Sequence, residues 1–207
     1  MDIRVQTIRV GAERTNCYIV SDDKGNTFVV DPGAEADKII NLLQEIKNID
    51  LKFFLLTHGH FDHIGAVDGI KKVYPDCIVY LPENDEVLYC DLPEQGAFVG
   101  RVLMPQHSEI TAVSGGQFIK FGDEEIEIVD TPGHTPGGVC YLLGYNLFTG
   151  DTLFFHTYGR VDLPLANPKK MEESLDKLLH MSSQLTVYPG HGQSTTIAEE
   201  KAYNKYY

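Results

Sequence analysis

The segment that decides the fold is Thr57-His58-Gly59-His60-Phe61-Asp62-His63. It follows the apolar run Lys52-Phe53-Phe54-Leu55-Leu56, a pattern typical of a buried strand. Alternate side chains of an extended chain share a face, so we expect three of the four ligands to point one way and the last, His63, another. One segment could therefore serve two neighbouring ions. Its possible metal ligands are His58, His60, Asp62 and His63.

Imidazole and carboxylate ligands without thiolate favour zinc or iron, usually in a catalytic site with open positions. Three more candidates each follow an apolar strand pattern by a few residues. They are His134 after Thr131-Pro132-Gly133, Asp151 after Gly150, and His191 after Pro189-Gly190. The adjacent Gly and Pro residues indicate tight turns. The economical arrangement brings all these strand ends to one edge of the molecule.

The seven ligands then divide into two sets of three and a bridge. His58, His60 and His134 are assigned to one ion, and Asp62, His63 and His191 to a second. Asp151 is assigned as the bridge, because a carboxylate has two oxygens whereas an imidazole offers one nitrogen to an ion. The sequence therefore predicts two divalent metal ions. Zinc is the first choice, with iron or manganese as the alternatives.

The other three histidines are interpreted separately. His180 lies near a helix end, where the helix dipole favours a cation, and we expect it to be structural. His107 is expected to be exposed in a long loop. His156 could line the pocket, although lone histidines are seldom ligands.

Length and composition predict one soluble domain over residues 1–207. A chain of 207 residues can bury a substantial core, and a hydrophobic content of 43% is ordinary for a globular protein. The net charge of −13 argues against nucleic acid, which needs a basic face. No signal peptide or membrane span is visible, and the four cysteines form no CxxC pair. We expect a cytoplasmic protein with reduced cysteines and no membrane contact, and its oligomeric state stays open.

The order of predicted elements is strands first and helix last, twice. The first half has strand patterns at 3–10, 15–20, 27–31, 52–56 and 77–81, with helices at 35–48 and 64–74 and a short helix beginning at Pro82. The second half has strand patterns at 117–121, 125–130, 139–143, 146–149 and 185–188, with helices capped by Asn167 and Thr196. Residues 91–116 show little periodicity and are expected to form a long loop beside the active site. Two sheets packed face to face with helices outside are predicted.

These motifs resemble the metallo-β-lactamase superfamily, whose signature is HxHxDH followed by separated His, Asp and His. Within it, Thr131–Gly137, Gly150–Phe154 and Gly159–Pro164 resemble the glyoxalase II-like hydrolases. The resemblance implies an α/β (α+β) fold, a four-layer αββα sandwich. True zinc β-lactamases have a cysteine where Asp151 stands. Full-length glyoxalase II has a C-terminal glutathione-binding domain that we expect this chain to lack, and a Cys-Gly pair in many relatives is Thr157-Tyr158 here.

The resemblance implies a metal-dependent hydrolase of a small acyl thioester or ester, with a metal-activated hydroxide at a binuclear site. A bound metal lowers the pKa of water to about 7, and Asp62 is expected to orient the nucleophile. Thioesters are favoured over amides, because a thiolate leaving group needs no general acid. Arg101 and Arg160 are the expected substrate-binding cations, and an ion pair with Asp162 is the structural alternative for Arg160.

Two other function classes stay open at this point. Persulfide dioxygenases of the same superfamily use one iron held by two histidines and an aspartate, which here would be His58, His134 and Asp151. A non-catalytic metal-binding module ranks last, since structural zinc sites are usually closed and rich in cysteine. The acidic charge disfavours the nuclease activity found elsewhere in this superfamily.

Overall fold

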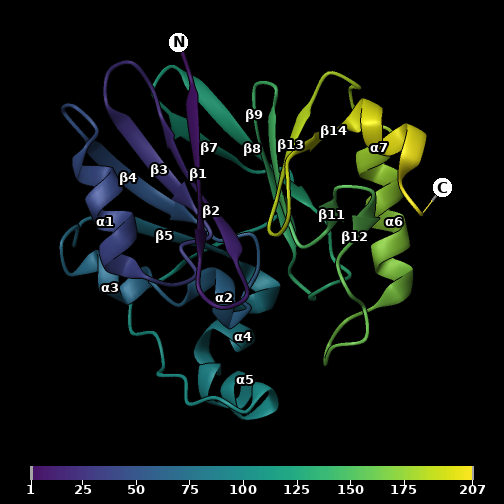
Figure 1. Cartoon of the computed structure of the whole chain (residues 1–207), viewed down its shortest axis with the longest axis horizontal. Helices are drawn as coiled ribbons and strands as arrows, with labels where there is room; N and C mark the ends of the chain where they lie inside the picture. The colour runs from purple at the N-terminus through teal and green to yellow at the C-terminus, as the bar shows by residue number, and fades with distance from the viewer. Residues whose placement is uncertain (1, 207) are drawn as a thin grey trace. The chain divides into compact units, whose positions relative to one another are not determined.

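The computed structural model describes residues 2–206 and divides into two compact units. The first unit comprises the residues up to 81 together with 86–112, and the second comprises 82–85 together with the residues from 113 onward. Each main sheet has six strands, and Figure 1 shows the helices that flank it. The expected single domain over 1–207 stays a prediction.

The first sheet has the strand order β1-β2-β3-β4-β5-β6. Its strands are β1 (Arg4–Val10), β2 (Thr15–Ser21), β3 (Asn26–Val30), β4 (Asp50–Leu55), β5 (Ile78–Pro82) and β6 (Thr111–Val113). The pairs β1–β2 and β2–β3 are antiparallel, whereas β3–β4 and β4–β5 are parallel. Parallel neighbours need a crossover connection, and helices supply it here. The first of these is α1 (Ala36–Gln44), which buries Ile39, Ile40 and Leu43.

The second crossover corrects the predicted helix at 64–74. The chain forms two short helices instead, α2 (Phe61–Ile64) and α3 (Val67–Lys71). The break comes from close packing, because a Cβ at Gly65 would lie 2.5 Å from the Gly33 carbonyl oxygen. The Ala66 amide also donates to the Pro32 carbonyl oxygen at 2.9 Å. The chain therefore bends around the 32–33 turn, and α3 then lies beside α1 (Figure 1).

The loop predicted at 91–116 is wrong for much of its length. Residues there form α5 (Leu92–Val99) and β6, and α4 (Glu86–Cys90) precedes them. A proline in the first turn of α5 and the left-handed Gly100 at its end are ordinary helix boundary signals. The short helix expected from Pro82 is also corrected, since Pro82 ends β5 and a 3-10 turn, η1 (Glu83–Asp85), follows it.

The second sheet has the order β14-β13-β10-β9-β8-β7. Its strands are β7 (Phe118–Phe121), β8 (Glu124–Asp130), β9 (Val139–Leu143), β10 (Asn146–Gly150), β13 (Thr186–Pro189) and β14 (Thr195–Thr196). The strands predicted at 117–121 and 125–130 are confirmed and pair as the hairpin β7–β8, and those predicted at 139–143 and 146–149 pair as the hairpin β9–β10. The short ribbon of β11 (Leu153–Phe154) and β12 (Thr157–Tyr158) was not predicted.

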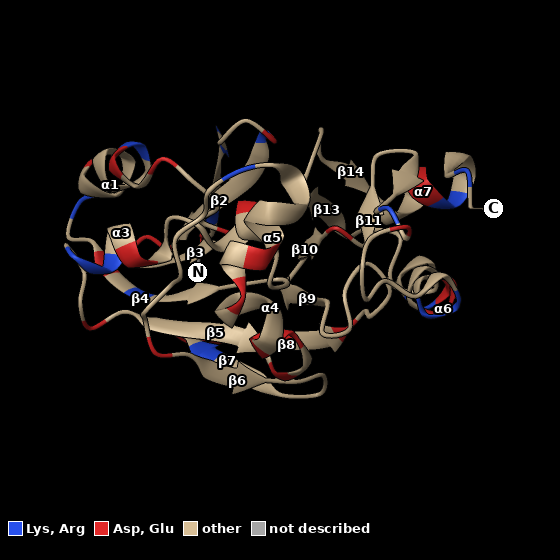
Figure 2. Ribbon diagram, turned by 90° about the horizontal axis from the view of Figure 1, so that it is seen from below, with Lys and Arg blue, Asp and Glu red and all other residues tan. Residues whose placement is uncertain are grey.

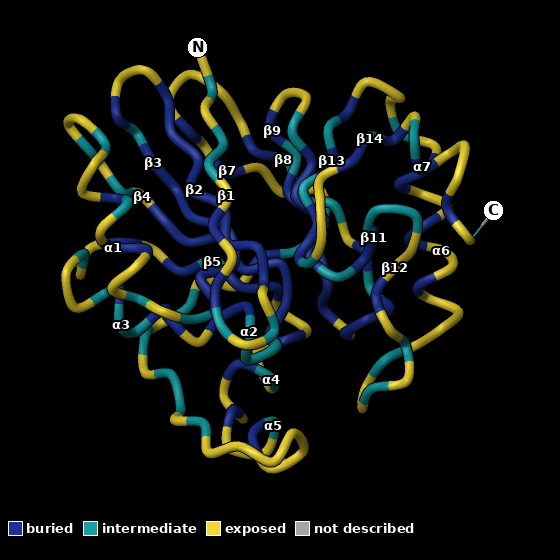
Figure 3. Tube along the Cα trace, in the orientation of Figure 1, coloured by how far each residue is buried: buried dark blue, intermediate teal, exposed yellow. Residues whose placement is uncertain are grey.

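Helix α6 (Pro168–Leu179) connects the parallel strands β10 and β13, and Asn167 caps it as expected by accepting from the Lys170 amide. Thr196 likewise caps α7 (Ile197–Tyr203) through the Glu199 amide. Each unit has its own apolar core, and Figure 3 shows the buried course of β2, β3 and β9. Among the described residues, no helix has both the length and the apolar character needed to cross a membrane.

Candidate metal centre

The first unit gathers the four ligands of the 57–63 segment at the end of β4. His58 and His63 are buried, and their ring centroids lie 4.1 Å apart. The rings of His58 and His60 meet at 4.9 Å, and Nε2 of His63 lies 3.5 Å from Oδ2 of Asp62. The segment changes from extended backbone at His60 to helix at Phe61. This change of backbone conformation turns the side chains of Asp62 and His63 toward those of His58 and His60.

Asp31 orients part of this cluster from the end of β3. Its carboxylate is buried and accepts the Thr57 amide at 2.8 Å, the Thr57 hydroxyl at 2.7 Å and Nδ1 of His63 at 2.9 Å. Asp31 has a φ of +50°, which is unusual for a residue with a side chain. Such strain persists where the surroundings over-determine it, and three hydrogen bonds do so here.

Thr57 links the Asp31 carboxylate to His58 through hydrogen bonds. The single hydroxyl hydrogen of Thr57 goes to Asp31, so the hydroxyl oxygen accepts from Nδ1 of His58 at 3.0 Å. Nδ1 of His58 and of His63 therefore carry the proton, and Nε2 of each ring carries the lone pair. Metal-binding histidines commonly donate their second ring nitrogen to such a partner, which sets the tautomer and the ring direction.

The backbone of the ligand segment is held by α5. The Gln95 side chain accepts from the Phe61 amide at 2.9 Å and donates to the Gly59 carbonyl at 3.0 Å. It also donates to the Leu88 carbonyl at 2.8 Å, which links the segment to α4. On the other side, the Thr15 hydroxyl donates to Oδ2 of Asp62 at 2.7 Å.

The second unit gathers its three ligands around Asp151. Oδ2 of Asp151 lies 3.4 Å from Nε2 of His134 and 3.5 Å from Nε2 of His191. Nδ1 of His134 donates to the Arg160 carbonyl oxygen at 2.8 Å, so its Nε2 also carries the lone pair. The carboxylate thus stands between two imidazole rings. The cluster lies where β8, β10 and β13 end.

Glycines allow the close turns that carry these ligands. Gly133, before His134, has a φ of +149°, and a Cβ there would lie 2.5 Å from the Met171 backbone. A Cβ at Gly159 would lie 1.8 Å from the Asp151 carbonyl oxygen. Neither position can accept a side chain without a shift of backbone. The turn at Gly133 therefore packs directly on α6, and the residue that follows the β11–β12 ribbon packs directly on the backbone of Asp151.

The donor set fits divalent metal ions. It contains imidazole and carboxylate groups only, which zinc and iron both accept. Three of the imidazoles have Nδ1 committed to an acceptor, so that Nε2 offers its lone pair. The candidate ligands are His58, His60, Asp62 and His63 in the first unit, and His134, Asp151 and His191 in the second.

The two candidate substrate cations are both bound to carboxylates. The Arg101 guanidinium pairs with Glu13 and lies 5.8 Å from the centroid of the Phe61 ring. The Arg160 guanidinium makes two hydrogen bonds to Asp162, at 2.7 and 2.8 Å, and is exposed. These bonds raise the pKa of Arg160 and hold the pKa of Asp162 at about 2. The alternative expected for Arg160, an ion pair with Asp162, is present.

The remaining histidines follow their expectations in part. His107 is exposed, as predicted, and Nδ1 of His180 lies 2.7 Å from the Asp176 carbonyl at the end of α6. The His156 ring stacks on Phe155, and its Nε2 lies 2.9 Å from a carboxylate oxygen of Glu199. It thus contacts α7.

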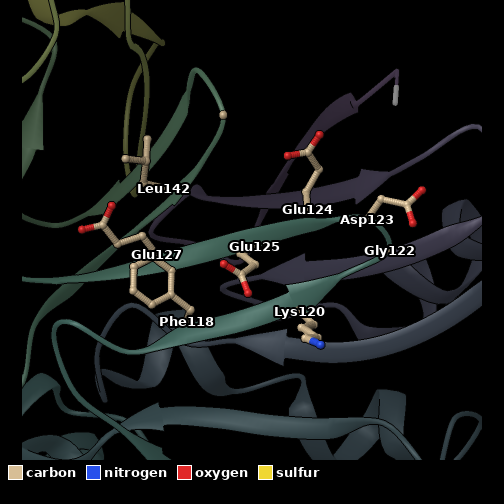
Figure 4. A pocket seen from close by; sticks show the side chains of 9 residues that line it. Phe118, Lys120, Gly122, Asp123, Glu124, Glu125, Glu127 and Leu142 are labelled. Carbon is tan, nitrogen blue, oxygen red and sulfur yellow. The ribbon is translucent and has the colours of Figure 1, made fainter.

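A surface hollow lies on the second unit between the β7–β8 hairpin and the β9–β10 turn (Figure 4). Its lining includes Phe118, Lys120, Glu125, Glu127 and Leu142. Glu125 and Glu127 precede Asp130 along β8, and the lining also includes Gly144, before β10 begins. The hollow is therefore near the strand ends opposite to those that carry His134 and Asp151.

The profile of the metallo-beta-lactamase superfamily matches residues 10–191. This chain belongs to the metallo-β-lactamase superfamily. The predicted membership and the predicted mixed α/β fold with two sheets are confirmed. The HxHxDH segment and the later His, Asp and His all lie within the matched range.

Three proteins of known sequence or structure are similar to this chain over nearly its whole length. The hydroxyacylglutathione hydrolase GloC of Haemophilus influenzae is 34% identical over 99% of this chain and 98% of its own. The crystal structure of the BLEG-1 B3 metallo-beta-lactamase has a TM-score of 0.91 at 30% identity, covering 98% of this chain and 99% of that one. The crystal structure of TTHA1623 in a di-iron-bound form has a TM-score of 0.89 at 33% identity, covering 98% and 100%.

Sequence reasoning missed the residues that orient the ligands. The sequence marks Asp31 only as the last residue of the strand pattern at 27–31, and Thr57 only as the first residue of the ligand segment. Thr15 and Gln95 carried no signal, because their partners lie 47 and 34 residues away. Pro93 and Gly100 are residues that commonly mark the two ends of a helix, and they could have placed Gln95 on one.

Proposed function

We propose that this chain, a metal-binding, hydrolase-like member of its superfamily, hydrolyses acyl thioesters of the hydroxyacylglutathione type at a centre of two divalent ions. The observation that carries the proposal is the committed Nδ1 atoms of three candidate ligand histidines, which present Nε2 for a metal. The full-length likeness to GloC supports the thioester substrate class. Zinc is the proposed metal, with iron or manganese as alternatives.

The proposed ligand sets are the two that the sequence predicts. One ion is assigned to His58, His60 and His134, and the other to Asp62, His63 and His191. Asp151 is assigned to both ions. The position of its Oδ2 between the Nε2 atoms of His134 and His191 supports a shared ligand.

Bound ions would lower the pKa of water to about 7 and polarise the thioester carbonyl. The chain's own part is to place its groups. The Thr15 hydroxyl holds one side of the Asp62 carboxylate, which leaves Asp62 set to orient the attacking water. The leaving thiolate is stable near neutral pH, since thiols have pKa values of about 8.5, so no separate general acid is required.

Substrate binding is proposed for Arg101 and Arg160. Acidic residues lie on α4 and α5 (Figure 2). Arg101 follows α5 and offers a cation there to a carboxylate of the substrate. Both arginines now bind carboxylates of the chain. A substrate anion therefore has to compete with Glu13 or Asp162. Loss of Arg101 should raise KM more than it lowers kcat, because a ground-state contact is removed.

The test combines metal analysis with turnover. Metal-replete protein should hold about two ions per chain and hydrolyse S-lactoylglutathione. Asp151→Ala should lose metal from both positions and lose turnover, whereas His191→Ala should keep one ion. Normal metal content and turnover in Asp151→Ala would contradict the shared ligand. If the chain holds one iron ion and consumes oxygen with glutathione persulfide, it is a dioxygenase and the proposed hydrolase activity is wrong. If it hydrolyses a β-lactam and no thioester, it is a β-lactamase.

A further inference from the structure

The β11–β12 ribbon is connected to all three candidate ligands of the second unit. Its first strand begins two residues after Asp151. Arg160, two residues beyond the end of its second strand, accepts a hydrogen bond at its carbonyl oxygen from Nδ1 of His134 at 2.8 Å. Phe154 meets the His191 ring edge to face, with centroids 5.9 Å apart. A shift of this ribbon would therefore move or release each ligand.

The turn of the ribbon is held by a buried carboxylate on α7. Glu200 is fully buried, and its Oε2 accepts from the His156 amide at 2.9 Å and from Nδ2 of Asn204 at 2.7 Å. Its Oε1 accepts from the Thr195 hydroxyl at 2.7 Å. Asn204 also donates to the Thr157 carbonyl at 3.0 Å. Two backbone groups of the turn are thus tied to the last helix.

The turn needs such a restraint, because His156 has a φ of +57°. This left-handed conformation is disfavoured for a residue with a Cβ, and it persists only where the surroundings impose it. The His156 ring is in contact with Phe155, Glu199 and Tyr203. The ring contacts are half-exposed, whereas the hydrogen bond from the amide to Glu200 reaches a carboxylate that solvent does not touch.

We propose that Glu200 is a positioning residue for the metal centre. Through the His156 amide it fixes the ribbon, and the ribbon in turn fixes the Arg160 carbonyl that orients His134 and the backbone that carries Asp151. The inference rests on the proposed function in one respect, namely that these ligands hold metal. It assigns α7 a role in metal retention, although none of its residues is a candidate ligand.

The test measures metal retention by the full chain loaded with Co²⁺. Glu200→Ala should release Co²⁺ to a chelator about tenfold faster than the wild type, as expected when a partner that orients a ligand is lost. Its Co²⁺ absorption spectrum should also change, since the spectrum reports ligand geometry. Glu200→Gln should restore both, because its amide oxygen can accept from His156 and Asn204 while its NH₂ group donates to the Thr195 hydroxyl.

The matched control is Glu199→Ala on the same helix. Glu199 contacts the His156 ring and not its amide, so this variant should keep the wild-type release rate and spectrum. If Glu200→Ala fails to fold, Asn204→Ala takes its place and should change both readouts in the same direction.

Three results would overturn the inference or its premise. A wild-type release rate and spectrum in a folded Glu200→Ala would leave α7 with a purely structural role, and the proposed function would stand. Equal losses in Glu199→Ala and Glu200→Ala would show that the ring, and not the amide, holds the turn. If the wild type retains no Co²⁺, the proposed function fails and the inference falls with it.

Discussion

The carboxylate of Asp31 accepts the Nδ1 proton of His63 at 2.9 Å, and both side chains are almost completely buried. The same carboxylate binds the Thr57 hydroxyl, which in turn accepts from His58. One acidic group outside the ligand set therefore controls the tautomers of two candidate ligands. The charge is placed where it makes Nε2 of His63 a better donor to a metal.

Asp31→Asn should weaken metal binding by about 10–100-fold with little change in the fold. An amide offers one acceptor oxygen, so either the Thr57 amide or Nδ1 of His63 then faces an NH₂ group. Asparagine tolerates the left-handed backbone, which keeps the comparison clean. Zinc affinity measured with a competing chelator checks the prediction. Asp22→Asn, which alters a carboxylate in the turn before β3, is the control and should leave zinc affinity unchanged.

Gln95→Met should lower zinc affinity by about tenfold and reduce turnover, because the segment between His58 and Asp62 loses two backbone hydrogen bonds. Methionine matches glutamine in length but neither donates nor accepts in this setting. Gln106→Met is the matched control, since Gln106 accepts from the Asp68 amide beyond the ligand segment. Equal zinc affinities in wild type and Gln95→Met would show that the segment holds its shape without α5.

Gly33→Ala should destabilise the chain by about 1–3 kcal/mol or more and also lose metal. A Cβ at this position would lie 1.6 Å from the Asp62 carbonyl oxygen, and that oxygen belongs to backbone that cannot rotate away. Urea unfolding and metal content are the two measurements. Gly100→Ala meets no heavy atom within 4 Å, so its left-handed φ of +71° should cost about 1–2 kcal/mol and leave metal content intact. Full metal content in folded Gly33→Ala would contradict the close approach.

Thiol labelling should detect one fast cysteine per native chain at pH 8. Burial raises the pKa of Cys77 and of Cys140 to about 12 and raises the pKa of Cys17 as well, while Cys90 is exposed. A raised pKa keeps a thiol protonated up to that pH, and the thiolate is the reactive form. Denatured protein should show all four thiols. Rapid labelling of a second native thiol would mean that one buried cysteine opens to solvent.

The sequence predicted correctly those helices and strands whose boundaries are set by residues close together in the chain. The strands on either side of Gly122 and Gly144 and the cap at Asn167 depend on residues that are neighbours in sequence, and all are confirmed. The helix at 64–74 was wrong, because Gly65 packs on a turn from another part of the chain. The loop at 91–116 was wrong because weak periodicity outweighed sound boundary signals at Pro93 and Gly100.

The sequence by itself determined the superfamily and the list of candidate ligands, since the spacing of HxHxDH and the later His, Asp and His is written in the chain. Only the tertiary structure decided which groups orient those ligands. Asp31 and His63 are 32 residues apart, Gln95 and Phe61 are 34 apart, and Glu200 and His156 are 44 apart. A hydrogen bond needs its atoms within a few tenths of an ångström of the right distance. Such precision over these separations comes from strand register and helix packing, which no local pattern encodes.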